Sequence, residues 1–176
     1  MTARVLRSLP MLLLAFLYGT ASAESFNGVV SYVTDGDTLW VRPVSGGPAW
    51  QVRLEGIDAP EICQASGIEA RAALAARVLH RRVQVALTTQ DSYQRWLGRV
   101  SLDDQDVGEW LVRHGHAWSY RFKSDRGPYG AFEARARQAR IGLWQDADAM
   151  PPRRFRQAHG SCHPDRSPVP AQPAPP

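Results

Sequence analysis

Two acidic turns and a nearby arginine contain the residues of this sequence that are best suited to bind a divalent cation and a phosphate together. Asp35 and Asp37 lie in one predicted turn, and Asp58 and Glu61 lie in a second turn shortly after Arg53. Carboxylate oxygens are the ligands that Ca²⁺ and Mg²⁺ prefer, and a guanidinium pairs with phosphate through parallel hydrogen bonds. Each residue alone also has an ordinary structural explanation, in which turn aspartates accept backbone N–H groups and arginines pair with neighbours. The combination favours a metal-assisted phosphate site.

Short β-strands are the elements that would position these turns. The segments 28–34, 38–42 and 50–54 are rich in β-branched residues or alternate apolar with polar side chains, which predicts a three-stranded meander. The segments 83–87 and 97–102 alternate in the same way and predict a fourth and a fifth strand. Because a small barrel holds the loops at its strand ends rigidly, we expect both acidic turns at one site.

About three helices are expected around these strands. The first follows the third strand, and its apolar stripe comprises Ile68, Ala72, Ala75 and Leu79. Asp106 and Glu109 have the spacing of a capping box that opens a short second helix, and a third is expected over about 128–141. This order predicts a mainly β, α+β fold: a five-stranded OB-type Greek-key barrel with packed helices.

Length and charge exclude several classes of protein. The chain has 176 residues, and its 21 Lys and Arg against 17 Asp and Glu give a formal net charge of +4. This length supports one domain with a hydrophobic core, and the mild basicity permits a polyanionic partner without requiring one. Two cysteines exclude a cysteine-rich zinc module. No apolar run approaches the ~18–20 residues that span a bilayer.

The N-terminus has the pattern of a secretory signal peptide. Arg4 and Arg7 precede the apolar run 11–17, and the small residues before Ala23 form an A-x-A cleavage site. We expect residues 1–23 to be removed after Ala23 and the mature protein to be secreted or periplasmic, with no membrane association. The alternative is a retained membrane anchor.

Export would place both cysteines in an oxidising compartment. A disulfide between Cys63 and Cys162 would then tie the C-terminal segment to the domain. The alternative is metal binding by His159, Cys162 and His163, although no fourth ligand stands at a usual spacing.

The C-terminal part divides into two segments after a domain that we expect over 24–148. Residues 149–163 form a basic extension with Arg153, Arg154 and Arg156, which would either contact a nucleic-acid backbone or be solvated. The proline-rich residues 164–176 cannot bury a core and are expected to be disordered.

Three motifs of this sequence resemble those of the staphylococcal nuclease (thermonuclease) family. They are Asp35-Gly36-Asp37-Thr38, Arg53-Leu54-Glu55-Gly56-Ile57-Asp58-Ala59-Pro60-Glu61 and Asp91-Ser92-Tyr93-Gln94-Arg95-Trp96-Leu97-Gly98. The later segments 111–117 and 142–144 match further landmarks, so the resemblance runs from about Gly28 to Trp144. It implies an OB barrel and calcium-dependent hydrolysis of phosphodiester bonds in DNA and RNA, with 3′-phosphate products.

The resemblance also implies roles for individual residues. Asp37 and Asp58 match the calcium-binding carboxylates, and the backbone carbonyl of Ala59 matches a third ligand. Arg53 and Arg95 match the two phosphate-binding arginines.

Glu61 matches the glutamate near the attacking water, as general base or as the group that orients the water. Tyr120 matches one nucleotide-contacting tyrosine, the second aligns with Phe122, and Tyr93 stands beside an expected phosphate-binding arginine. Gln94 replaces a glycine of the family pattern.

The leading hypothesis is an exported, monomeric, Ca²⁺-dependent, sugar-nonspecific nuclease with DNA and RNA as substrates. The alternative is a non-catalytic OB-fold module that binds nucleic acid or another polyanion. Inactive relatives are expected to lack the carboxylate and arginine set, which is complete here. This favours the enzyme.

Overall fold

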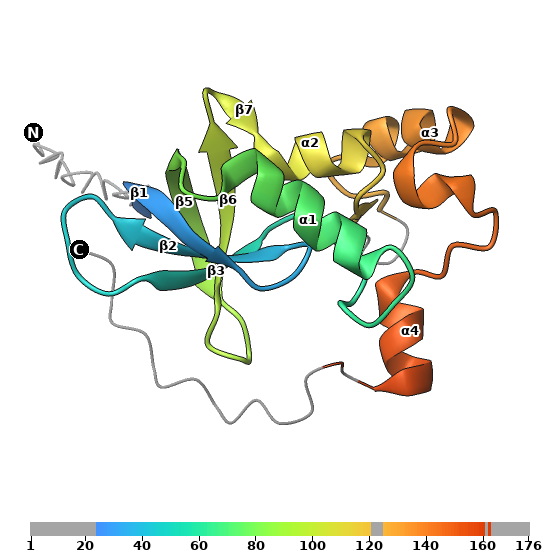
Figure 1. The fold of residues 1–176 in the computed structure, drawn as a ribbon, viewed down its shortest axis with the longest axis horizontal. Coiled ribbons are helices and arrows are strands. Elements are labelled where there is room, and N and C mark those ends of the chain that lie inside the picture. Colours follow the sequence, from blue (N-terminus) through green and yellow to red (C-terminus); the bar gives the residue numbers. More distant parts are fainter. Residues whose placement is uncertain (1–23, 121–124, 161, 163–176) are drawn as a thin grey trace, which may run out of the picture.

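Five strands form a barrel in the computed structural model, which describes residues 24–120, 125–160 and 162 (Figure 1). They are β1 (Glu24–Val33), β2 (Thr38–Pro43), β3 (Trp50–Leu54), β5 (Arg82–Gln90) and β6 (Trp96–Leu102). Neighbours in the order β3-β2-β1-β5-β6 pair antiparallel, and β3 pairs with β6 in parallel, which closes the barrel. The predicted OB-type α+β fold is confirmed. The predicted signal peptide, Phe122, His163 and the proline-rich tail lie outside the described residues.

Apolar side chains at alternate strand positions fill the barrel. Successive side chains of a strand point to opposite faces, so one half of each strand can be buried while the other half meets solvent. The fully buried side chains include Val30, Leu39, Val41, Val52, Val85 and Val100, each 0% exposed. This close-packed interior holds the strand ends, and the turns they carry, in fixed positions.

The pairing of β2 with β3 brings the first acidic turn to the arginine. Thr38 pairs with Arg53 across the two strands, and the Leu54 N–H donates to the Asp37 carbonyl at 2.8 Å. The turn that carries Asp37 is therefore locked to the end of the strand that carries Arg53.

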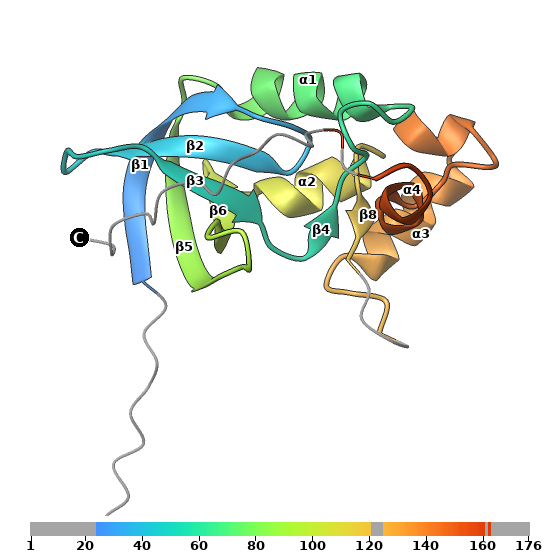
Figure 2. The ribbon, with the colours of Figure 1, turned by 90° about the horizontal axis from the view of Figure 1, so that it is seen from below.

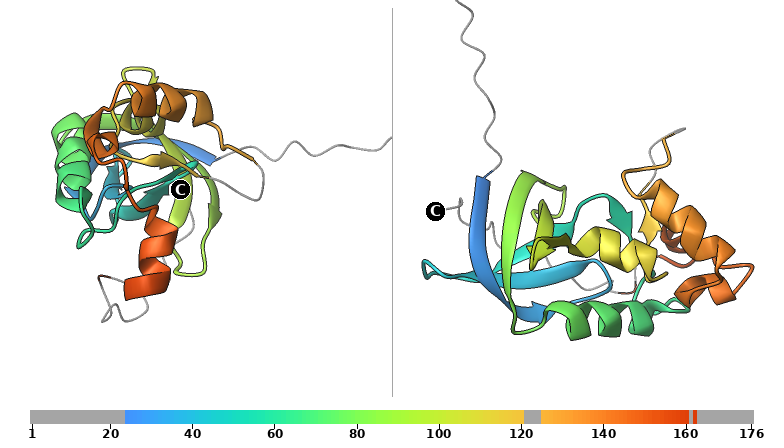
Figure 3. Two further views of the ribbon diagram at one scale, coloured as in Figure 1. Left: turned by 90° about the vertical axis from the view of Figure 1, so that its right-hand side faces the viewer. Right: turned by 90° about the horizontal axis from the view of Figure 1, so that it is seen from above.

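Among the residues that the structure describes, four α-helices cover one side and one end of the barrel (Figures 1 and 3). They are α1 (Gly67–Val78), α2 (Val107–Arg113), α3 (Gly130–Gln138) and α4 (Pro152–His159), with a 3₁₀ turn at Gly142–Gln145. One half of the predicted capping box of α2 is present, because the Glu109 N–H donates to Asp106 Oδ1 at 3.0 Å, whereas the Glu109 side chain pairs with Arg113. The fourth helix, α4, lies in the predicted basic extension and was not expected.

The predicted apolar stripe of α1 is wrong at Ile68 and Ala72, which are exposed, whereas Ala75 and Leu79 are partly buried against the core. Ile68 is 69% exposed, whereas the buried positions of α1 are Gly67, Ala70, Leu74 and Val78. The reason is close packing against the first acidic turn: a Cβ on Gly36 would lie 2.8 Å from that of Ala70. Only a small residue fits where α1 meets this turn, while Leu74 and Val78 further along the helix pack into the core.

Two short strands that the sequence pattern did not indicate hold the second acidic turn. β4 (Ile57–Asp58) pairs antiparallel with β8 (Trp118–Ser119), and Asp58 lies opposite Trp118 (Figure 2). Another two-residue strand, β7 (Gln105–Asp106), extends the sheet beside β6. Helix α3 fastens β8 through Glu133, which is 1% exposed and accepts the Ser119 N–H at 2.9 Å. Arg137 pairs with the same carboxylate at 2.7 Å, so the position of Asp58 depends on a buried glutamate of α3.

None of the helices among the described residues is both long and apolar enough to cross a membrane.

Glu133→Ala removes the acceptor of a buried backbone N–H and the partner of Arg137. We expect the free energy of unfolding to fall by about 2–4 kcal/mol, because the buried donor is left unsatisfied. Urea denaturation followed by tryptophan fluorescence measures the change. Glu69→Ala, at an exposed glutamate of α1, is the control; an equal loss in both variants would contradict a special role for Glu133.

Candidate active site

Arg53 joins the two acidic turns. Its Nη1 lies 2.6 Å from Asp37 Oδ1, and its Nη2 lies 3.1 Å from Asp58 Oδ1. Asp37 and Asp58 are only 4% and 6% exposed. The structure therefore brings together three residues that the sequence placed at one site, with both carboxylates facing one cation.

Backbone and side-chain donors hold the Asp37 carboxylate in place. The Thr38 hydroxyl donates to Oδ1 at 3.0 Å, and the Ala59 N–H donates to Oδ2 at 3.1 Å. The last contact joins the two turns directly. It requires a glycine at position 36, since a Cβ there would lie 2.7 Å from the Ala59 Cβ.

The protonation of the carboxylates reflects their crowding. Burial raises the pKa of Asp58, and the charge on Asp37 raises it further, although Arg53 and Arg156 act in the opposite direction. Burial also acts to raise the pKa of Asp37, but Arg53 and the Ala59 N–H hold it below its ordinary value.

Asp35 belongs to the same crowded group. Burial and the charge on Asp37 raise the pKa of Asp35 to about 7, and its Oδ1 accepts the Asp37 N–H at 3.1 Å. The charge on Asp35 is thus coupled to Asp37 and Arg53, although Asp35 is not one of the residues expected to hold a cation.

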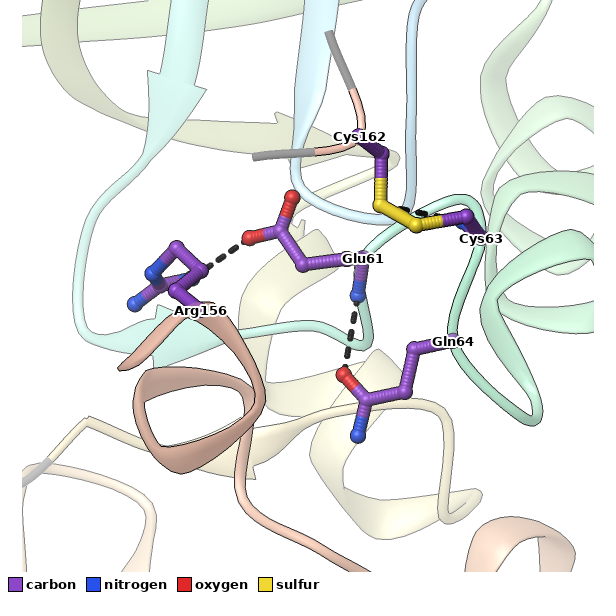
Figure 4. The surroundings of a disulfide bond; sticks show 5 residues. All are labelled: Glu61, Cys63, Gln64, Arg156 and Cys162. Atoms are coloured by element: carbon purple, nitrogen blue, oxygen red, sulfur yellow. Dashed lines mark hydrogen bonds and ion pairs between the residues drawn. A yellow bond between two sulfur atoms is a disulfide. The ribbon is translucent and has the colours of Figure 1, made fainter. Parts of the chain in front are cut away.

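Glu61 is held by an arginine from the far C-terminal part of the chain. Arg156 of α4 places Nη1 2.6 Å from Glu61 Oε1, and its Nη2 lies 3.3 Å from Asp58 Oδ2 (Figure 4). The sequence placed Arg156 only in a basic extension, so its contact with the site was missed. The sequence did contain a signal for this helix, because a proline is typical of the first helical position and Pro151 and Pro152 stand just before the arginine-rich segment.

Arg95 is positioned by Asp91 within the hairpin between β5 and β6. The two side chains pair at 2.7 Å, and Asp91 Oδ1 also accepts the Arg95 N–H at 3.0 Å. The positive charge of Arg95 contributes to lowering the pKa of Asp37. Gln94, which replaces a glycine of the family pattern, adopts a positive φ of 61° in this loop. Asp91 was not predicted as a site residue.

The two tyrosines predicted to bind substrate lie at the surface. Tyr93 is 71% exposed, and its ring centre lies 5.3 Å from the Arg95 guanidinium carbon. Tyr120 is 49% exposed and directly follows β8, where its N–H donates to the Gly56 carbonyl at 2.8 Å. Both rings are free to meet a ligand.

Asp37, Asp58 and the Ala59 carbonyl provide the donor types that a divalent cation would need. Two carboxylates and a carbonyl are hard oxygen ligands of the kind preferred by Ca²⁺ and Mg²⁺. Both carboxylates already converge on one cationic group, the Arg53 guanidinium. Within the described ranges, no group of three or more His, Cys, Asp or Glu side chains could hold a metal by itself. Asp37, Asp58 and the Ala59 carbonyl therefore suit a divalent cation whose remaining ligands would be water or substrate oxygens.

The predicted bridge between Cys63 and Cys162 is present, with the two Cα atoms 5.8 Å apart. Because the Cys162 sulfur is part of the disulfide, it is not a thiolate ligand for the alternative metal site that would use His159, Cys162 and His163. It also places the C-terminal segment beside the second acidic turn (Figure 4).

Comparisons with known proteins identify the family of this chain. Residues 51–146 match the family model described as "Staphylococcal nuclease homologue". The chain belongs to the staphylococcal nuclease family. A "Micrococcal nuclease" of Shigella flexneri is 36% identical over 144 residues, which cover 76% of this chain and 82% of that protein.

Two further relatives of this staphylococcal nuclease homologue align over most of their length. An "Uncharacterized endonuclease" of Haemophilus influenzae is 33% identical over 84% of this chain and 82% of its own length. "Protein ParB" of Escherichia coli is 37% identical over 87% of this chain and 91% of its own. The family match ends at residue 146, before α4 begins.

Arg53→Ala would leave two adjacent buried carboxylates without their shared cation. We expect the free energy of unfolding in metal-free buffer to fall by about 3–5 kcal/mol, as for other broken buried ion pairs. Urea denaturation measures it, with the exposed Arg42→Ala of β2 as control. If both variants unfold at the same urea concentration, Arg53 does not offset the buried charge.

Proposed function

We propose that this protein is an exported, monomeric, Ca²⁺-dependent nuclease that hydrolyses phosphodiester bonds of DNA and RNA and leaves 3′-phosphate ends. The observation that carries the proposal is the cluster in which Arg53 bridges Asp37 and Asp58, while Arg156 links Glu61 to Asp58. Relatives named micrococcal nuclease and endonuclease support the reaction class.

The protein's own residues would divide the work of charge neutralisation. Asp37, Asp58 and the Ala59 carbonyl would hold the cation, which supplies Lewis-acid chemistry when bound. A phosphodiester is an anion that repels an attacking oxygen, so its charge must be offset before water can add. Arg53 and Arg95 would pair with the non-bridging phosphate oxygens and stabilise the extra charge of the transition state.

Glu61 is the group placed to act on water. Its carboxylate would accept the proton of the attacking water, or orient that water, as a new bond to phosphorus forms. The bond from phosphorus to the 5′-oxygen breaks, and that oxygen takes a proton from solvent. The proton of the attacking water passes to Glu61 or, if Glu61 only orients the water, to solvent. The 3′-phosphate product follows from this direction of cleavage.

The proposed contacts explain a lack of sequence preference. Contacts with phosphate fix the position of the strand but carry no sequence information. Tyr93 and Tyr120 would add stacking with bases or sugars, which every nucleotide permits. DNA and RNA would therefore both be substrates.

Glu61→Gln keeps the shape of the side chain and removes its basicity. We expect plasmid DNA and RNA to be cleaved by the wild-type protein in Ca²⁺ and left intact with chelator, and kcat to fall by about 10²–10⁴-fold in the variant. Gel-based initial rates measure both, and Glu69→Gln, at an exposed position of α1, is the matched control.

Two results of this experiment would contradict the proposal. Intact DNA with folded wild-type protein at every Ca²⁺ concentration would exclude the nuclease. Tight DNA binding without cleavage would instead support a non-catalytic OB-fold module.

Export has a separate test. Expression of the full chain in a Gram-negative host should yield a soluble protein outside the cytoplasm whose N-terminal residue is Glu24, because Ala23 ends the A-x-A site. Intact-mass measurement of fractionated cells identifies the cleavage. Recovery of the protein only in the cytoplasm with residues 1–23 attached would rule out export.

A further inference from the structure

Helix α4 is joined to the second acidic turn by three separate links, of which Figure 4 draws the Arg156–Glu61 contact and the disulfide. The buried Gln64 side chain accepts the Glu61 N–H at 3.2 Å and donates to the Met150 carbonyl at 2.6 Å, just before α4. Arg156 pairs with Glu61 from the helix itself. The Cys63–Cys162 disulfide then ties down the segment that follows the helix.

From this arrangement we infer that Arg156 is a positioning residue for Glu61, and that the disulfide keeps it in place, so that hydrolysis depends on the oxidised bridge. The inference rests on the proposed nuclease function. It assigns a role to a residue beyond the segment 51–146 that matches the family model.

The geometry at Glu61 suits positioning. Arg156 Nη1 donates to Glu61 Oε1 at 2.6 Å, while its contacts with the Asp58 carboxylate are longer, at 3.3 and 3.4 Å. Among the described residues, none donates a hydrogen bond to the second oxygen, Glu61 Oε2. One oxygen is thus fixed by the guanidinium, and the other stays available for water.

The helix depends on its links because it buries little of its own surface. α4 has eight residues, of which only Pro152 is buried, while Phe155 and Arg156 are half-buried. A helix this short is not stable in isolation. The disulfide joins positions 99 residues apart, so it limits how far the end of α4 can move from the turn that carries Glu61.

The same contacts could instead make Arg156 a plug that competes with the cation at Asp58. This alternative predicts the opposite result, because removal of the guanidinium would raise activity or lower the Ca²⁺ concentration that is needed. The shorter contact with Glu61 favours positioning.

Kinetics on the mature full-length protein test the inference. We expect Arg156→Ala to lower kcat for plasmid cleavage in Ca²⁺ by about 10- to 100-fold, as for other residues that orient a functional ligand, with KM for DNA within about twofold. Arg156→Lys should recover part of the loss because it keeps a donor and a charge. Gln157→Ala, at the exposed next position of α4, should leave kcat unchanged.

The role of the disulfide is tested in the same assay. The double variant Cys63→Ser/Cys162→Ser should lose kcat, and adding Arg156→Ala to it should cause no larger loss than Arg156→Ala alone, since both changes remove one interaction. A reductant should slow the wild-type protein and leave the double variant unaffected. Free-thiol labelling and thermal unfolding of Arg156→Ala confirm that the bridge and the fold persist.

Hydrogen exchange gives a readout that does not depend on activity. Amides of residues 152–159 should exchange faster in the reduced protein and in the double variant than in the oxidised protein. Unchanged exchange would show that the bridge does not hold α4.

The outcomes separate this inference from the proposed function. Active wild-type protein with unchanged kcat in Arg156→Ala overturns the inference alone, and so does higher activity or a lower Ca²⁺ requirement in that variant. Wild-type protein that is oxidised and folded but does not cleave overturns the proposed function and the inference with it.

Discussion

Two carboxylates buried side by side lose their hydration and repel each other, and the fold must offset both costs. Arg53 does so by bridging Asp37 and Asp58, with the Thr38 hydroxyl and the Ala59 N–H completing the hydrogen bonds of Asp37. The same negative crowding makes the cluster suited to a divalent cation and, on our proposal, to phosphate chemistry. The Arg53 guanidinium and the carboxylates of Asp37 and Asp58 therefore stabilise the fold and, on our proposal, also take part in catalysis.

Much of the remaining architecture keeps this cluster assembled. The register of β2 against β3 brings Asp37 to Arg53, and the pairing of β4 with β8 fixes Asp58. Behind β8, the buried Glu133 of α3 accepts a backbone N–H and pairs with Arg137. A contact path thus runs from an outer helix to a carboxylate of the site, so a change well outside the site can disturb its geometry.

The C-terminal segment adds to what the barrel provides. The barrel's own turns carry Glu61 but leave its carboxylate to be oriented by Arg156 of α4. A short helix with little buried surface can hold a charged side chain in place only if it is anchored, and the Cys63–Cys162 disulfide and Gln64 anchor it. On our proposal, the protein would work best in an oxidising compartment, where such a bridge persists.

Local patterns in the sequence determined most of the barrel and the nucleus of the site. Alternation and β-branched residues marked all five long strands. The family motifs identified Asp37, Arg53 and Asp58, which lie near one another in the chain. Short connections bring consecutive strands together, so residues this close in sequence also meet in the fold. The start of the α1 stripe was misjudged, since Ala70 packs against Gly36 and the helix buries Leu74 and Val78 on that face, which leaves Ile68 exposed.

Only the tertiary structure decided the partner of Glu61 and the support of Asp58. Strands of two residues, such as β4 and β8, are too short to show a period. Arg156 and Glu61 are 95 residues apart in the chain, so their contact depends on how the folded chain returns to the barrel. The cysteine pair predicted that the C-terminal segment returns to Cys63, but no local pattern specified which side chain of that segment meets Glu61.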